Sequence, residues 1–135
     1  MIDTSGRLTL DELIHLINGS RLMITNDTGP MHMAFACNTT CLALFGPCHP
    51  VQYGYNENAY CFYSGVYCSP CVHEFLIPPC KGDNQCMKRI RVDEVLQVFQ
   101  SWLDGSGLPS RITRNEVYWT DDRNMPLGLV RRNLY

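Results

Sequence analysis

The chain has 135 residues and a formal net charge of −2, and hydrophobic and charged residues make up 45% and 18% of it. This composition is typical of one globular domain and excludes a wholly disordered chain. The densest basic stretch, Lys88, Arg89 and Arg91, is too small a positive surface to predict a nucleic-acid-binding protein. No apolar run approaches the roughly 20 residues that cross a bilayer, and no secretory signal is recognisable, so we expect a cytoplasmic protein.

The first predicted element is a helix from about Leu10 to Asn18. Its apolar residues recur at helical spacing and therefore lie on one face: Leu10, Leu13, Ile14 and Ile17. Thr9 and Glu12 have the spacing of a capping box, and Gly19 is a natural end for the helix.

Next come apolar runs that predict buried strands. Residues 22–25 are apolar without alternation, which is typical of a strand buried on both faces of a parallel sheet. A helix from about Pro30 to Cys37 follows, with proline favoured at its first position. Residues 41–45 form a second such run, and a weaker third strand covers residues 59–63. This order predicts a parallel, Rossmann-like α/β unit.

The last predicted helix runs from Val92 to Leu103 and ends at Gly105 and Gly107. We expect its buried face to comprise Val92, Val95, Leu96, Phe99, Trp102 and Leu103. Residues 1–104 are therefore interpreted as one domain with a cysteine-rich insertion at about 61–87, and residues 105–135 as a C-terminal tail. Two or three strands are few for a complete doubly wound sheet, so we expect a fragment of a larger α/β protein.

The turn from Asn26 to His32 is the strongest candidate for a binding site. It follows a predicted strand and opens a helix, which is where α/β proteins bind ligands. Amide groups near Thr28, Gly29 and Met31, together with the helix dipole, could hold a diphosphate. Asp27 would repel a phosphate and is better suited to accept hydrogen bonds from sugar hydroxyls. His32 in the same turn could donate to the phosphate or to the sugar.

A purely structural interpretation of this turn stays open from the residues alone. An Asp or Thr before a helix is often only an N-cap, and a single histidine on a helix is usually structural.

The chain contains eight cysteines in two groups. Four are scattered among apolar neighbours and are interpreted as small core residues: Cys37, Cys41, Cys48 and Cys61. The other four, Cys68, Cys71, Cys80 and Cys86, have the spacing C-x2-C-x8-C-x5-C. This pattern predicts a closed, structural zinc site, with His73 as a spare ligand. Two disulfides, an iron–sulfur centre and reduced thiols are the alternatives.

Two longer strings extend the candidate turn. The first is Asp27-Thr28-Gly29-Pro30-Met31-His32-Met33-Ala34-Phe35-Ala36, and the second is Phe45-Gly46-Pro47-Cys48-His49-Pro50, followed by Gly54. Together they resemble the signature of glycosyltransferase family 9, the heptosyltransferase family, and the resemblance extends to about Leu103. Cys48 stands where that signature usually has Thr, and Tyr55 where it has Pro.

The resemblance implies a GT-B glycosyltransferase, of which this chain would be part of the C-terminal, donor-binding lobe. Thr28 and Gly29 would hold the diphosphate of a nucleotide sugar such as ADP-heptose, and Asp27 would hold the sugar. Pro30, Met31 and His32 would line the pocket, and Phe45, Gly46 and Pro47 would form an adjacent wall.

The implied reaction is inverting transfer to lipopolysaccharide core or a related glycan, without a catalytic cofactor. The general base would lie in an N-terminal lobe outside this chain, so no catalytic residue is assigned here, and the chain alone is expected to be inactive. Such an acceptor implies peripheral contact with the inner membrane. The alternative function is a zinc-stapled protein-interaction module without catalytic activity.

Overall fold

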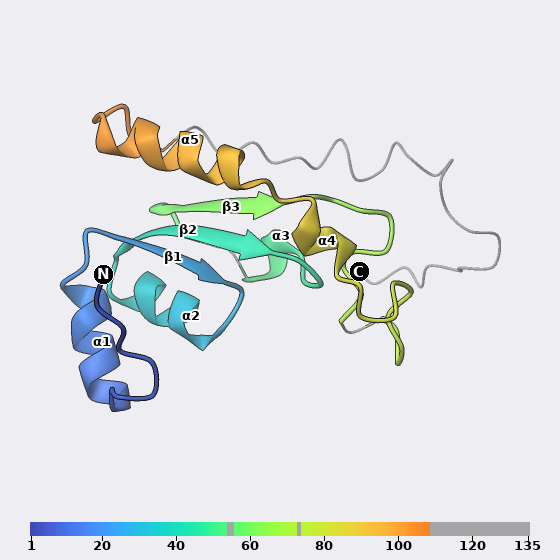
Figure 1. The fold of residues 1–135 in the computed structure, drawn as a ribbon, viewed down its shortest axis with the longest axis horizontal. Helices are drawn as coiled ribbons and strands as arrows, with labels where there is room; N and C mark the ends of the chain where they lie inside the picture. The colour runs from blue at the N-terminus through green and yellow to red at the C-terminus, as the bar shows by residue number, and fades with distance from the viewer. Residues whose placement is uncertain (54–55, 73, 109–135) are drawn as a thin grey trace.

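The computed structural model describes residues 1–53, 56–72 and 74–108. Its elements follow in the order α1 (Leu10–Asn18), β1 (Leu22–Asn26), α2 (Gly29–Ala36), β2 (Thr40–Phe45), α3 (Pro50–Tyr53), β3 (Ala59–Tyr63), α4 (Gln85–Lys88) and α5 (Val92–Leu103). The three strands form one parallel sheet in the order β1-β2-β3, with helices on both of its faces (Figure 1). The predicted Rossmann-like α/β unit is confirmed.

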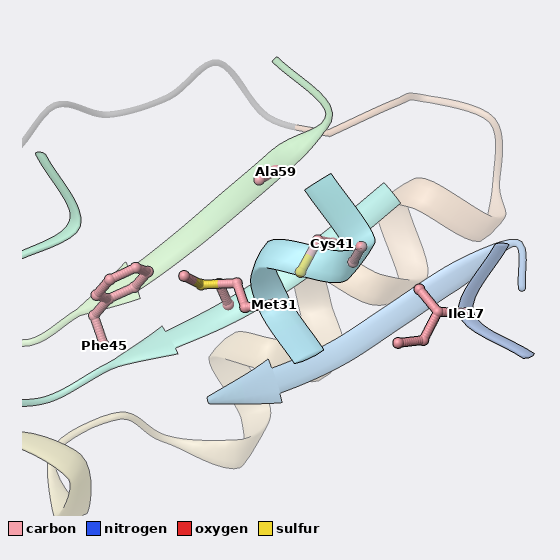
Figure 2. Close-up of a cluster of buried hydrophobic side chains, with 7 residues drawn as sticks. Ile17, Met31, Cys41, Phe45 and Ala59 are labelled. Atoms are coloured by element: carbon pink, nitrogen blue, oxygen red, sulfur yellow. The ribbon is translucent and has the colours of Figure 1, made fainter. Parts of the chain in front are cut away.

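The central strand β2 divides the core into two layers, because alternate side chains of a strand point to opposite faces. On one face, Cys41, Ala43 and Phe45 join side chains from α1 and α2, among them Ile17 and Met31 (Figure 2). On the other face, Leu42 packs with Phe62 of β3 and Val98 of α5. The sheet is therefore held between α1 and α2 on one side and α5 on the other.

Helix α1 begins with the predicted capping box. The Thr9 amide donates to the Glu12 carboxylate at 2.8 Å, and the Glu12 amide donates back to Thr9 Oγ1 at 3.3 Å. The helix ends at Gly19, as its sequence predicts. None of the described helices is long and apolar enough to span a membrane.

Two predictions about burial are wrong. Strand β1 was expected to be buried on both faces, but it lies at an edge of the described sheet and Ile24 is 50% exposed. Helix α5 contacts the sheet through Val98, with Val95 and Phe99 beside it. Val92, Leu96 and Leu103 of the predicted face are instead exposed. The apolar stripe of α5 is wider than its contact with the sheet, so helical periodicity alone does not predict which of its residues are buried.

Part of the predicted organisation lies outside the described residues. This applies to residues 109–135 of the expected tail and to Gly54, Tyr55 and His73. The division into a domain at 1–104 and a tail at 105–135 stays a prediction.

Candidate functional site

The turn between β1 and α2 is open at its helical end. Thr28 is the N-cap residue of α2, with extended backbone at φ −151°, but its side chain makes no capping hydrogen bond. Its hydroxyl donates to the Asn26 carbonyl at 3.3 Å instead. The structure thus gives no support to the interpretation of Thr28 as an ordinary side-chain N-cap.

At the start of α2, the open space beside Gly29 and the positive end of the helix dipole both suit an anion. A Cβ atom placed on Gly29 would meet nothing within 4 Å, and Thr28 and Gly29 are exposed. The first N–H groups of a helix have no partner within it and carry the positive end of its dipole. The first turn of α2 contains no acidic side chain that would offset this partial charge.

Asp27 connects this turn to the loop after β2. Its amide donates to the Leu44 carbonyl at 3.2 Å, beside the last pair of the β1–β2 register, Asn26 and Leu44. Burial, followed by the hydrogen-bonding and charge effects of the nearby Asp27 carboxylate, raises the pKa of Cys48 to about 12. The thiol is therefore neutral at physiological pH.

The sequence predicts Cys48 to be a small core residue, and Cys48 indeed packs against the core cluster that contains Met31 and Phe45. It is partly exposed and lies beside Asp27. The available signal was its place in the second string, at the position where the family signature usually has the hydroxyl of Thr.

The two histidines of the strings have different surroundings. The exposed His32 ring on α2 meets Phe35 and Tyr53 edge-on, with ring centroids 6.0 and 6.4 Å apart. His49 packs edge-on against Tyr63 at 4.9 Å, and burial lowers the pKa of its imidazole. His32 is thus exposed at the candidate turn, while His49 packs against β3.

Three predicted site residues belong to the interior. Met31 and Phe45 are fully buried, and the Met31 amide already donates to the Thr28 carbonyl at 3.0 Å. Gly46 is also buried, and a Cβ added to it would lie 2.6 Å from Met87 Sδ. Burial follows because β2 is the central strand and α2 packs over it. The predicted residues that remain at the surface or partly exposed are Asp27, Thr28, Gly29, Pro30, His32 and Pro47.

The second cysteine group is partly assembled. Cys68, Cys71 and Cys86 are buried thiols, and burial is the main reason that the pKa of each is raised. Cys80 differs, because backbone amides of Asn84 and Gly82 donate to its sulfur and lower its pKa. As the side chains stand, the described residues contain no group of three or more His, Cys, Asp and Glu that could hold a metal ion. The zinc site stays a prediction.

Comparisons with known proteins agree with the resemblance in the strings. Residues 2–79 match the family model described as "Glycosyltransferase family 9 (heptosyltransferase)". The chain is 32% identical over 105 residues to a lipooligosaccharide heptosyltransferase 2 of Campylobacter jejuni, covering 76% of the chain and 32% of that protein. It is 41% identical over 46 residues to the lipopolysaccharide heptosyltransferase 2 of Escherichia coli, covering 34% of the chain and 13% of that protein.

The chain therefore spans about a third or less of the length of these relatives. No solved structure matches it closely.

Proposed function

The chain belongs to glycosyltransferase family 9, and from this premise we propose that it forms the donor-binding part of a heptosyltransferase. The observation that carries the proposal is the open turn at Thr28 and Gly29, at the carboxyl edge of a parallel sheet. The proposed donor is a nucleotide-diphosphate sugar, with ADP-heptose as the specific candidate. The proposed acceptor is lipopolysaccharide core or a related glycan, reached by peripheral contact with the cytoplasmic face of the inner membrane.

In this proposal, different residues of the turn bind different parts of the donor. The amides of Thr28 and Gly29 bind the diphosphate, because they combine exposed N–H groups with the positive end of α2. Pro30 has no N–H to donate and serves to begin the helix. The Asp27 carboxylate accepts from the sugar hydroxyls, and His32 lies one helical turn further along the rim.

In this proposal, the turn between β1 and α2 contributes to the reaction by stabilising the leaving group. An acceptor hydroxyl attacks the anomeric carbon and loses its proton, while the bond from that carbon to the diphosphate oxygen breaks. Negative charge then grows on the departing nucleoside diphosphate. Fixed amides aimed at that charge lower the barrier and need no metal ion to do so. The base that takes the acceptor proton belongs, in this proposal, to another part of a longer protein.

Replacing Asp27→Ala tests the proposal. Loss of a charge-assisted hydrogen bond should lower affinity for ADP-heptose roughly 10- to 100-fold, as measured by calorimetry. Asp11→Ala, which removes an exposed carboxylate from the first turn of α1, is the matched control and should leave that affinity unchanged. If the unsubstituted protein bound neither ADP nor ADP-heptose, the proposed function would be wrong.

The alternative function, a zinc-stapled interaction module, rests on the four-thiol spacing and on the amides that donate to Cys80. It predicts one equivalent of zinc in the purified protein and a loss of partner binding when a chelator removes that metal. Asp27→Ala would leave such binding unchanged, which separates the two functions. Zinc content is measured by elemental analysis, with Cys80→Ser as the variant that should lose the metal.

A further inference from the structure

The short helix α3 follows the carboxyl end of β2 and is preceded by a histidine that contacts the sheet (Figure 1). The Val51 amide donates to His49 Nδ1 at 3.1 Å, and the Gln52 amide donates to the His49 carbonyl at 3.0 Å. The same imidazole packs edge-on against Tyr63 of β3, with ring centroids 4.9 Å apart. The start of α3 is therefore held to the sheet through His49.

The last residue of α3, Tyr53, contacts both the core and α2. It is partly buried and packs against the hydrophobic cluster that contains Met31 and Phe45. Its ring also meets the exposed imidazole of His32 edge-on, with ring centroids 6.4 Å apart and ring planes at 81°. An edge-to-face arrangement at this separation is favourable for two aromatic rings. Tyr53 thus connects the core to a side chain at the surface of the candidate site.

His32 has a second aromatic neighbour on its own helix. Phe35, three residues further along α2, meets the imidazole edge-on with ring centroids 6.0 Å apart. Residues three apart lie on the same face of a helix, and helical side chains lean toward its N-terminus. By this geometry the His32 side chain leans toward Gly29, which has no side chain of its own and has open space beside it. The two aromatic rings thus hold the imidazole near the amides proposed to bind the diphosphate.

We propose that Tyr53 is a positioning residue for His32, and that the positioned imidazole donates a hydrogen bond to the diphosphate of the donor. Tyr53 does not touch the ligand in this arrangement. It restricts an exposed side chain before binding, so less side-chain entropy is lost when the diphosphate binds. The inference rests on the proposed function, because it assigns a residue of α3 to the support of the same site.

A double-mutant cycle on ADP binding, measured by calorimetry, tests whether Tyr53 acts through His32. Tyr53→Leu keeps an apolar side chain against the core but removes the ring, and His32→Ala removes the imidazole. Each should lower the affinity for ADP roughly 2- to 10-fold, the range for one ordered side chain or one hydrogen bond. The double variant should bind ADP no more weakly than His32→Ala alone, because the ring then has no imidazole to position. Tyr53→Phe keeps the ring and should keep most of the affinity.

Tyr60→Leu is the matched control. Tyr60 is also partly buried and meets the ring of Phe62 edge-on at 4.9 Å, but it packs on the opposite face of the sheet. Its replacement should leave the affinity for ADP unchanged. Melting temperatures are measured alongside. If Tyr53→Leu fails to fold, the unsubstituted protein decides the matter: nuclear Overhauser contacts between the rings of His32 and Tyr53 should persist in the ADP complex, and their loss there would contradict the inference.

Two results of the cycle would overturn the inference while leaving the proposed function standing. One is an unchanged affinity for ADP in Tyr53→Leu. The other is an equal loss from Tyr53→Leu with and without the His32 imidazole, which would make the role of Tyr53 purely structural. Failure of the unsubstituted protein to bind either ADP or ADP-heptose would overturn both the inference and the proposed function.

Discussion

The turn after β1 and the turn after β2 both lie at the carboxyl edge of the parallel sheet, and both contain a glycine. Around Gly29 there is open space, whereas the space beside Gly46 is filled by Met87 and Cys86. The first turn leaves room for a ligand to reach the backbone, and the second lets a loop pack against it. Two similar motif strings are thus packed differently: the glycine of the first is open, and the glycine of the second is covered by a loop.

The largest expected effect comes from exchanging these glycines for alanine. Gly46→Ala forces a Cβ into Met87 and should lower the free energy of unfolding by about 1–3 kcal/mol. Gly29→Ala adds a Cβ to open space in a helix and should not lower the free energy of unfolding, and can raise it by up to about 1 kcal/mol. Urea denaturation of both variants checks the comparison, and equal losses would remove the distinction between the two turns.

The source of the Gly46 effect can be identified with a second substitution. If Met87 is the obstacle, Met87→Ala should cost less in the Gly46→Ala protein than in the unsubstituted one, with a coupling energy of about 0.5–3 kcal/mol. The four proteins of this double-mutant cycle are compared by denaturation. Strict additivity would mean that the added methyl clashes elsewhere.

A smaller effect on stability is expected from replacing two threonines that each precede a helix. Thr9→Ala removes a complete capping box and should cost about 1 kcal/mol. Thr28→Ala removes no capping bond from α2, so we expect a loss below about 0.5 kcal/mol. Thermal denaturation measures both variants. A similar loss of stability in the two would mean that Thr28 is an ordinary N-cap.

A further prediction is a decline in stability at alkaline pH. The pKa values of Cys41 and Cys48 are raised from 9.0 to about 11 and about 12 in the folded chain, chiefly by burial. A raised pKa means that the folded state binds the proton more tightly than the unfolded state. The corresponding stability is complete below pH 9 and is lost as the pH rises from 9 toward 12. Denaturation at pH 8–11 should show this decline, and a shallower one in Cys48→Ser; a flat profile would contradict it.

Much of the fold could be predicted because local signals agree with it. The capping box of Thr9 and Glu12, and the unbroken apolar run at 41–45, each fix an element without knowledge of its neighbours. Burial was harder to predict, because it depends on which elements are adjacent. Ile24 looks like a core residue in sequence, yet its strand lies at an edge of the described sheet.

The candidate site shows the same difference between features set by local sequence and features set by packing. Residues whose role is set by the turn itself, such as Thr28 and Gly29, were identified correctly as lying at an exposed helix start. Phe45 and Gly46 were placed in the site only by their position in a motif, and packing assigns them to the interior. Asp27 and Cys48 follow two different strands, so neither motif string alone indicates that they are neighbours in space.

Backbone resonances of the turn give the most direct test of the central claim that α2 begins at an anion site. In a ¹⁵N-labelled sample titrated with ADP, the amides of Thr28 and Gly29 should shift more than any others and should report one saturating affinity. Adenosine, which lacks the diphosphate, should leave both signals in place. Unmoved Thr28 and Gly29 amides in the presence of bound ADP would contradict the account.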